Sequence, residues 1–482
     1  MNNKELRMSI PMQVKRCFLV GLLMLFFFSH QMFAAGNKIK GLITNYQGDK
    51  VFLAMIYGGK QYVVDTANAV NGTFMFDSYY DLESGVYLVV LPPAKSFLLL
   101  IDRNIPEFNF TADNKDVEGT IQFQGSPDNT AYYKYLKFFQ AKRNELDSIK
   151  TTYDAQKNEP DKAALLAKMQ QLKKEVLLYQ TELVQRNPGT LTAAIVKCEL
   201  PVDVPTFDGS PEDIQMKKYL FQKAHFFDNI DLKDERLIRA PKNVLVDRVE
   251  YYLDNLTPQS PDSINTSVDY ILDKCKQTQV TYRFLLTYMF NKYREAKKIG
   301  MDGVYVHIAE AYIATGKAPW IEEEEKSKVL SAVKAISPTL IGKKAPNFTV
   351  QTEDDKNISL YDIQSPYTIL IFWAPNCTHC QQSMPQLNTF YKAYKDKGVQ
   401  VFAVCTKVNE QEKSCWDYID KNQFTGWING SDKNGGTSSI QTMYNVKTTP
   451  KIYVVDKDKK ILVKDIGVEN LEEVFKRLFP TK

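Results

Sequence analysis

Two cysteines near the C-terminal end of the chain, Cys377 and Cys380, are separated by two residues. An apolar run, 368–373, leads into them and a helical pattern follows, so the pair opens a helix at the end of a strand. The unpaired amides of a helix N-terminus favour a thiolate over a thiol, and this spacing lets the sulfurs form a disulfide with little backbone movement. The pattern therefore indicates thiol–disulfide exchange, with Cys377 as the nucleophile.

The elements that must position these cysteines predict an α/β domain over residues 341–482. Besides the cysteine helix, strands and helices are expected at 367–372, 399–405, 410–420, 439–444, 451–456, 461–466 and 471–479. Strand–helix–strand followed by a hairpin and a helix is the order of a thioredoxin fold.

Motifs in this domain resemble the thioredoxin superfamily. The motifs are Trp373-Ala374-x-x-Cys377-x-x-Cys380, Met384-Pro385 in the same helix, and Thr449-Pro450 before a strand. The entry segment Ala345-Pro346-Asn347-Phe348 is similar to that of the extracytoplasmic TlpA/ResA-like branch. The regions upstream look like the pair of uncharacterised domains that are often fused ahead of this branch in envelope proteins.

The resemblance implies a role for each site residue. Cys377 would attack a substrate disulfide, and the more buried Cys380 would resolve the mixed disulfide and release reduced substrate. The bond before Pro450 would be cis, leaving the Thr449 backbone free to pair with an extended substrate. Trp373 would pack against the site. No metal and no cofactor beyond a redox-active Cys377–Cys380 disulfide is expected.

His379 lies between the two cysteines. Its N–H or positive charge could stabilise the Cys377 thiolate, which would stabilise the reduced form and make the couple more oxidising. The alternative is an exposed surface histidine without a role.

Departures from the family pattern restrict the activity. Cytosolic thioredoxins carry a buried aspartate where this chain has Ile371, and cytochrome-maturation reductases carry a glutamate where it has Ser383. The lack of both proton-handling carboxylates weakens assignment as a cytochrome c maturation thiol reductase. Ala374 replaces the threonine that a peroxidase on this fold would need. The leading prediction is an enzyme that reduces or isomerises disulfides of envelope proteins. An envelope client-binding protein whose redox domain is accessory stays the main alternative.

Residues 37–127 alternate short β-branched and aromatic runs with turns, which predicts an all-β sandwich. This stretch contains neither histidine nor cysteine, so we interpret it as a packing or interaction module.

Residues 128–340 predict an α-helical module. Apolar residues recur at steps of four and three, so a long helical hairpin is expected over 129–187, followed by a helical bundle over 190–338. The same heptads could form a homodimer seam, and this alternative stays open. His225 and His307 lack a second histidine at ligand spacing, which favours structural roles over metal binding.

Residues 1–36 predict a signal peptide. Basic residues precede an apolar stretch, 17–28, and small residues follow at Ala34 and Gly36. The stretch is shorter than the roughly 20 residues that span a bilayer, so a cleaved signal is favoured. Because cleavage after Ala35 would leave bulky Phe33 three residues before the cut, a retained anchor stays an alternative. The expected location is the periplasm or cell envelope.

Export would leave the remaining cysteines in a compartment where disulfides persist. Cys405 could pair with Cys415, and Cys198 with Cys275, but cysteine usage alone favours small buried hydrophobic residues in both cases.

Size and charge limit the partners. A chain of 482 residues exceeds a single core and predicts about three domains. A net charge of +4 over this length gives no field that would select nucleic acid or an anionic membrane. The expected partners are protein thiols and disulfides of the envelope and an electron donor in the membrane or periplasm.

Overall fold

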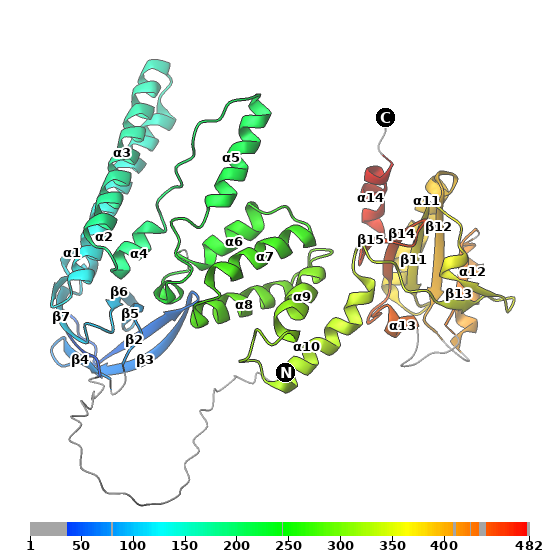
Figure 1. Cartoon of the computed structure of the whole chain (residues 1–482), viewed down its shortest axis with the longest axis horizontal. Coiled ribbons are helices and arrows are strands. Elements are labelled where there is room, and N and C mark those ends of the chain that lie inside the picture. Colours follow the sequence, from blue (N-terminus) through cyan, green and yellow to red (C-terminus); the bar gives the residue numbers. More distant parts are fainter. Residues whose placement is uncertain are drawn as a thin grey trace, which may run out of the picture.

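The computed structural model describes residues 36–78, 81–242, 244–407, 411–424, 426–432 and 440–479. The chain forms an all-β sandwich, then an α-helical region, then an α/β thioredoxin fold, which confirms the predicted fold class (Figure 1). The predicted signal peptide lies outside the described residues, except for Gly36. Within the described part of the chain, no helix combines the length and apolar character needed to cross a membrane.

Two four-stranded sheets, in the orders β4-β1-β7-β8 and β3-β2-β5-β6, make up the sandwich. Their strands are β1 Lys38–Thr44, β2 Lys50–Tyr57, β3 Lys60–Asn68, β4 Thr73–Asp77, β5 Gly85–Leu91, β6 Lys95–Ile101, β7 Glu107–Asp113 and β8 Gln122–Gln124, with the short helix α1 Val117–Thr120 before β8. Alternate residues of β4 and β7 are buried, as expected for strands with one face on the core. The rings of Phe97 and Phe110 meet between the two sheets, with centroids 5.7 Å apart.

The outer face of β5 is covered by the helical region, because the short helix η1, Glu235–Arg239, packs on β5 and β2. Gly58 N donates to Ile238 O at 2.8 Å, and a side chain at Gly85 would collide with Arg239. β5 is therefore buried on both faces, unlike β4 and β7.

A long helical hairpin follows the sandwich, formed by α2, Pro127–Ala155, and α3, Glu159–Arg186. Ile149 and Leu172 are buried in these helices, in agreement with the heptad pattern. The root of α2 is fixed to the sandwich by buried Asn129, whose side chain accepts from Leu100 N at 2.8 Å and donates to Leu100 O at 2.7 Å. The hairpin extends away from that root (Figure 1).

The rest of the helical region is a bundle. Its elements are α4 Leu191–Lys197, α5 Pro211–His225, α6 Val246–Asn255, α7 Pro261–Cys275, α8 Gln279–Arg294, α9 Asp302–Ile308, the π-helix η2 Ala309–Ala314, α10 Glu323–Ile336 and η3 Ser337–Thr339. One continuous apolar core extends from the sandwich into this bundle. The two N-terminal regions therefore form one packed unit.

The thioredoxin domain has a seven-stranded sheet in the order β10-β9-β13-β12-β11-β14-β15. Its elements are β9 Thr349–Gln351, β10 Asn357–Ser359, η4 Leu360–Asp362, β11 Tyr367–Trp373, α11 Thr378–Tyr394, η5 Lys395–Lys397, β12 Val399–Cys405, α12 Lys413–Asn422, β13 Ile428–Ser431, α13 Ile440–Met443, β14 Lys451–Asp456, β15 Ile461–Lys464, η7 Val468–Asn470 and α14 Leu471–Leu478. β11 is parallel to β12 and antiparallel to β14. Alternate residues of β11 supply two cores, one on each face of the sheet.

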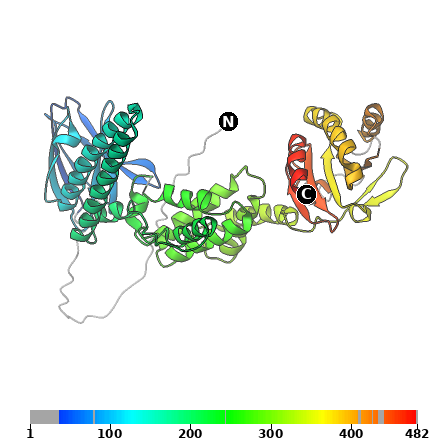
Figure 2. The same cartoon turned by 90° about the horizontal axis from the view of Figure 1, so that it is seen from above.

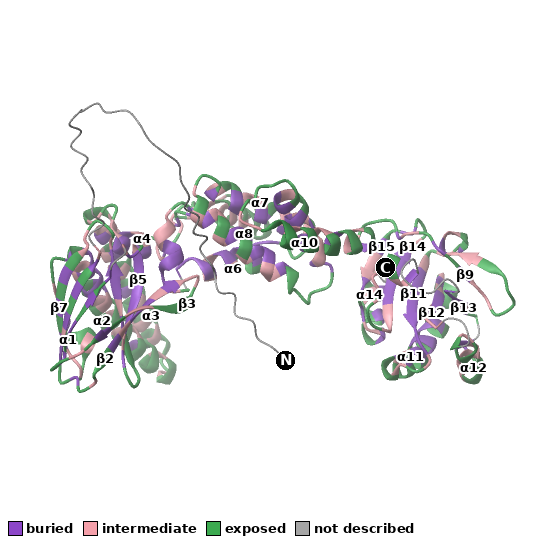
Figure 3. Cartoon of the chain, turned by 90° about the horizontal axis from the view of Figure 1, so that it is seen from below, coloured by how far each residue is buried: buried purple, intermediate pink, exposed green. Residues whose placement is uncertain are grey.

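The thioredoxin domain lies at the opposite end of the molecule from the sandwich, with the bundle between them (Figure 2). Buried residues line the interior of each part (Figure 3). At the junction, Lys464 of β15, whose side chain is 5 % exposed, forms an ion pair with Asp302 of α9. Gly342 N also donates to Ile461 O at 2.8 Å, which joins the connecting segment to β15.

Candidate active site

The dithiol is positioned by the strand at the centre of the sheet. All residues of β11 after Tyr367 are buried, and a short turn carries the chain from Trp373 to the first turn of α11. Cys377 is the N-cap of α11, and its Sγ accepts a hydrogen bond from Cys380 N at 3.2 Å. The first amides of α11 have no partner within the helix, and the Cys377 sulfur at the N-cap position accepts a hydrogen bond from one of them.

The environments of the two sulfurs give them different acidities. Burial alone would raise the pKa of Cys377, but hydrogen bonds from Cys380, Thr449 and the His379 backbone outweigh burial and lower it. Cys380 is 1 % exposed, whereas Cys377 is half-buried. Burial, followed by the interaction with Cys377, raises the pKa of Cys380 to about 12. The pair therefore combines an accessible, acidic thiol with a buried, protonated one.

The backbone just before β14, although distant in sequence, contacts the dithiol. Cys377 Sγ lies 3.1 Å from the carbonyl oxygen of Thr449, to which it donates as a thiol. The Thr449–Pro450 peptide bond is cis, which is the geometry that the family resemblance implies. The fold thus brings Thr449 and Pro450 to the sulfurs.

His379 acts on Cys377 through its main chain in this structure. Its backbone hydrogen bond lowers the pKa of Cys377, while the residue itself is exposed. A main-chain amide at this position is available to any non-proline residue. The role of the imidazole therefore stays a prediction.

Trp373 is fully buried beside the dithiol, and its indole ring packs on Tyr418 of α12 with centroids 5.4 Å apart. Sequence reasoning missed Tyr418. The available signal was its position three residues after Cys415, which places both side chains on the same face of a helix.

Cys405 and Cys415 form a disulfide, so the preference for two unpaired buried cysteines was wrong for this pair. Residue usage does not encode distance, and the pairing depends on how α12 packs against the end of β12. Cys198 and Cys275 are buried free thiols, and burial raises the pKa of each to about 12.

The positions that lack a family carboxylate have different surroundings. Ile371 is fully buried in the sheet. Ser383 lines a pocket of about 380 Å³ together with Pro450, Lys451 and Asp465. Lys451 is paired there with Asp465 at 3.1 Å.

The two histidines that the structure describes outside the thioredoxin domain each lie beside a single carboxylate. His225 Nδ1 lies 2.7 Å from Asp228 Oδ2, and His307 Nε2 lies 2.8 Å from Asp269 Oδ1. Among the described residues, no group of three or more histidine, cysteine, aspartate or glutamate side chains is arranged to hold a metal ion.

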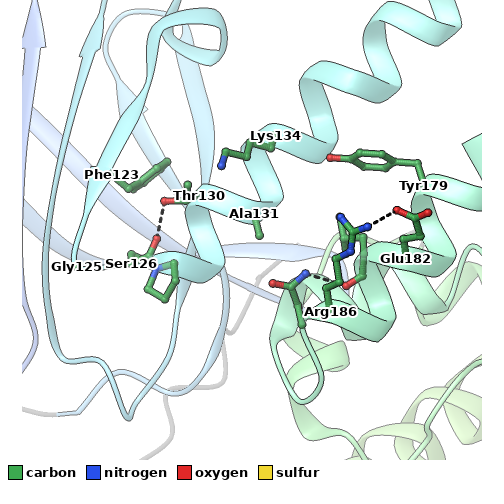
Figure 4. A pocket seen from close by; sticks show the side chains of 12 residues that line it. Phe123, Gly125, Ser126, Thr130, Ala131, Lys134, Tyr179, Glu182 and Arg186 are labelled. Atoms are coloured by element: carbon green, nitrogen blue, oxygen red, sulfur yellow. Dashed lines mark hydrogen bonds and ion pairs between the residues drawn. The ribbon is translucent and has the colours of Figure 1, made fainter.

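A second pocket, of about 660 Å³, lies far from the dithiol, where the sandwich, the start of α2 and the end of α3 meet (Figure 4). Phe123 and Tyr179 line it on either side, and Lys134 extends between them. Arg186 also lines the pocket and is paired with Glu182 at 2.8 Å.

Comparison with known families divides the chain in the same order as the fold. Residues 341–464 match the AhpC/TSA family. Residues 37–132 match the domain of unknown function DUF4369, and residues 178–337 match the domain of unknown function DUF5106.

Curated relatives align with the thioredoxin region. The thiol-disulfide oxidoreductase ResA of Bacillus cereus is 34% identical over 134 residues, which is 28% of this chain and 74% of that protein. The thioredoxin-like protein YneN of Bacillus subtilis is 33% identical over 127 residues, or 26% of this chain and 71% of that protein.

Two of the solved structures that match are also thioredoxin-like or thiol-disulfide exchange proteins by name. A domain of a possible thiol-disulfide isomerase from Cytophaga hutchinsonii is 36% identical, covering 30% of this chain and 95% of its own, with a TM-score of 0.27. A thioredoxin-like protein from Bacteroides caccae is 23% identical, covering 57% of this chain and 98% of its own, with a TM-score of 0.40.

The dithiol geometry and the similarity to ResA over most of its length lead to one assignment. The chain belongs to the ResA/TlpA-like thiol-disulfide oxidoreductases of the thioredoxin superfamily.

Proposed function

We propose that this oxidoreductase is exported and reduces or isomerises disulfides of envelope proteins through Cys377 and Cys380. The observation that carries the proposal is the contrast between the two sulfurs, one accessible with a lowered pKa and one buried with a raised pKa. A thiolate nucleophile beside a protonated partner is the arrangement that disulfide exchange requires.

The reaction balances with two electrons. The Cys377 thiolate attacks one sulfur of the substrate disulfide, forms a mixed disulfide and releases the other substrate sulfur as a thiolate. Cys380 then loses its proton, attacks Cys377 Sγ and releases the second substrate sulfur. The substrate gains two electrons, and the enzyme is left with a Cys377–Cys380 disulfide. A dithiol donor of the membrane or periplasm must reduce this disulfide for the next turnover.

The neighbouring residues support these steps in the proposal. The Thr449 backbone, beside Pro450, would pair with an extended substrate segment near Cys377. Trp373 would hold the turn that precedes the nucleophile. His379, exposed beside Cys377, would stabilise the thiolate further with its side chain.

Reduction of insulin by the full-length protein tests this function. Wild type should reduce the insulin disulfides with dithiothreitol as the donor, and Cys377→Ser should not. Cys380→Ser should instead accumulate a mixed disulfide on Cys377, visible by mass spectrometry. Equal rates for wild type and Cys377→Ser would favour the client-binding alternative.

Export is supported by the N-terminal sequence and by the buried Cys405–Cys415 disulfide, since such bonds persist mainly in oxidising compartments. N-terminal sequencing of protein purified from the envelope fraction checks this point. A mature chain starting near Gly36 agrees with a cleaved signal, and an intact Met1 indicates a retained anchor. Recovery of the protein in the cytoplasm contradicts export.

We further propose that the sandwich and helical region select client proteins for the dithiol, as their size and shared core suggest. The pocket is lined by Lys134, by the Arg186–Glu182 ion pair and by two aromatic rings, so it keeps a net positive charge, which fits an acidic client segment. Lys134→Glu with Arg186→Glu should slow reduction of native clients and leave reduction of insulin unchanged. Equal slowing of both substrates, or of neither, would contradict client selection.

Homodimerisation through the hairpin stays a separate proposal, supported by its heptad pattern. The sedimentation coefficient of the full chain tests it. A cytochrome c maturation role receives less support, because Ser383 and Ile371 occupy the carboxylate positions.

A further inference from the structure

The Cys405–Cys415 disulfide lies directly behind the dithiol. Cys405 is the last residue of β12, and the strand register places it opposite Trp373, the last residue of β11. The two cysteines are 1 % and 0 % exposed, respectively. A protein substrate therefore cannot reach either sulfur in the folded domain, and the bond is unsuited to exchange with clients.

The same disulfide anchors α12. Within this helix, which is described in full, Cys415 is the only buried residue. A helix of 10 residues is marginal without tertiary packing, and α12 obtains that packing from the Cys415 attachment together with Tyr418 and Ile419, which pack on the same core. Tyr418 lies about one turn after Cys415 and packs on the Trp373 ring.

Thr406, the residue directly after β12, also holds the main chain of Trp373. Thr406 donates to the Trp373 carbonyl oxygen twice, from its backbone N at 2.9 Å and from its Oγ1 at 3.0 Å. The Trp373 Nε1 is buried and makes no hydrogen bond to the described residues. The indole is therefore oriented by packing, to which Tyr418 contributes.

Trp373 leads from Thr406 to the reactive sulfurs. The next residue, Ala374, accepts a hydrogen bond from Cys377 N at 3.2 Å through its carbonyl oxygen. Trp373, Cys380, Cys405 and Cys415 belong to one apolar core. Burial raises the pKa of Tyr418, and a thiolate at the nearby Cys380 would raise it further.

We propose that the Cys405–Cys415 disulfide and Tyr418 are a positioning device for the dithiol. The disulfide stays oxidised during turnover and fixes α12, Tyr418 keeps the Trp373 ring in place, and Trp373 holds the turn that presents Cys377 to Cys380. This inference rests on the proposed function for turnover, but its effect on Cys377 reactivity can be measured without a substrate protein.

Variants of Tyr418 in the full-length protein give the first test. Tyr418→Ala should slow both the iodoacetamide alkylation of Cys377 and the resolution of its mixed disulfide with thionitrobenzoate about tenfold, or ~1.4 kcal/mol. The midpoint of the alkylation pH profile should move to higher pH, because a less ordered turn weakens the hydrogen bonds that stabilise the Cys377 thiolate. Tyr418→Phe keeps the ring and should stay within about twofold of wild type.

The disulfide itself is tested by Cys405→Ala combined with Cys415→Ala. This variant should reproduce the slower alkylation and resolution of Tyr418→Ala, while Cys198→Ala with Cys275→Ala, which removes two buried thiols elsewhere, should not. A folded variant with unchanged rates and midpoint overturns the proposal. If the double variant does not fold, an unchanged profile in folded Tyr418→Ala overturns it equally.

Trapping with N-ethylmaleimide during insulin reduction tests whether the disulfide takes part in exchange. With the trap added in denaturant, so that buried thiols also react, mass spectrometry should find Cys377 and Cys380 labelled in proportion to the reduced enzyme, with Cys405 and Cys415 still joined. Labelling of all four in parallel overturns a permanent bond. If wild type reduces no protein disulfide while Tyr418→Ala still shifts Cys377 alkylation, the proposed function fails and the positioning device stands.

Discussion

Two cysteines, one at the start of a helix and one at the end of a different helix, show what makes a thiol reactive in this molecule. Cys377 is the N-cap of α11 in the thioredoxin domain, and its sulfur accepts a hydrogen bond from the Cys380 amide. Cys275 is the last residue of α7 in the helical bundle, and its sulfur donates to the carbonyls of Ile271 and Leu272, both at 3.5 Å. One end of a helix offers amides to an anion, and the other offers carbonyls to a thiol.

Burial adds to this difference. The pKa of Cys275 rises to about 12, mainly because the sulfur is buried, whereas the pKa of Cys377 is lowered despite partial burial. The comparison teaches that compartment and residue type do not suffice for reactivity. A cysteine also needs hydrogen-bond donors and access to solvent.

The largest expected effect is on turnover. Cys377→Ser should reduce the rate of insulin reduction by about 10³-fold or more, because the other cysteines that the structure describes are buried or joined in a disulfide. Cys275→Ser should leave that rate unchanged. Turbidity of precipitating insulin chains measures both rates, and an active Cys377→Ser variant would contradict the assigned nucleophile.

Alkylation as a function of pH sharpens the contrast. A lowered pKa makes the thiolate appear at lower pH, so the iodoacetamide rate of Cys377 should rise well before that of an ordinary thiol. Cys275, with a pKa of about 12, should react about 10³-fold more slowly near pH 7 in the native protein. Peptide mapping after timed alkylation follows each site, and comparable rates at the two cysteines would remove the proposed distinction.

The shared core of the N-terminal regions predicts a stability effect that spares the dithiol. Asn129→Ala leaves Leu100 N–H and C=O buried without partners, which should lower the unfolding free energy of the sandwich–helix unit by about 3 kcal/mol. Asn144→Ala, on the exposed face of the hairpin, should change it by less than about 0.5 kcal/mol. Urea unfolding followed by circular dichroism measures both changes.

In the folded Asn129→Ala variant, the alkylation rate of Cys377 should equal that of wild type. A matching drop in Cys377 reactivity would mean that the two ends of the molecule are coupled.

The smallest effect is expected from His379. Because the backbone amide of residue 379 remains in His379→Ala, the couple should become more reducing by less than about 30 mV, the equivalent of about 1.4 kcal/mol. Equilibration with glutathione buffers gives the potential. A larger shift would mean that the imidazole is the main cause of the pKa difference between Cys377 and Cys380. A shift toward a more oxidising couple would contradict thiolate stabilisation by His379.

The local features of the active site were predictable from residues close together in the sequence. Strand β11 was expected at 367–372 and spans Tyr367–Trp373, and the cysteine pair opens the helix after it. The helical hairpin followed from spacing in the same way. Its turn and its helices are each set by residues within a few positions of one another.

Contacts between distant segments were harder to predict. The Cys405–Cys415 bond was judged less favourable than two free thiols, and Tyr418 was not considered. The continuity of the sandwich and bundle cores was also missed, because no periodic pattern shows which outer face of a sheet another element will cover.

The sequence by itself determined the chemistry available to this protein. A buried strand running into a Cys-x-x-Cys helix start places a thiolate where amides stabilise it, and this arrangement involves residues only a few positions apart. Only the tertiary structure decided what surrounds that thiolate. The Thr449 carbonyl, 72 residues away in sequence, and the disulfide behind Trp373 reach the site through strand register and helix packing, which depend on the whole sheet.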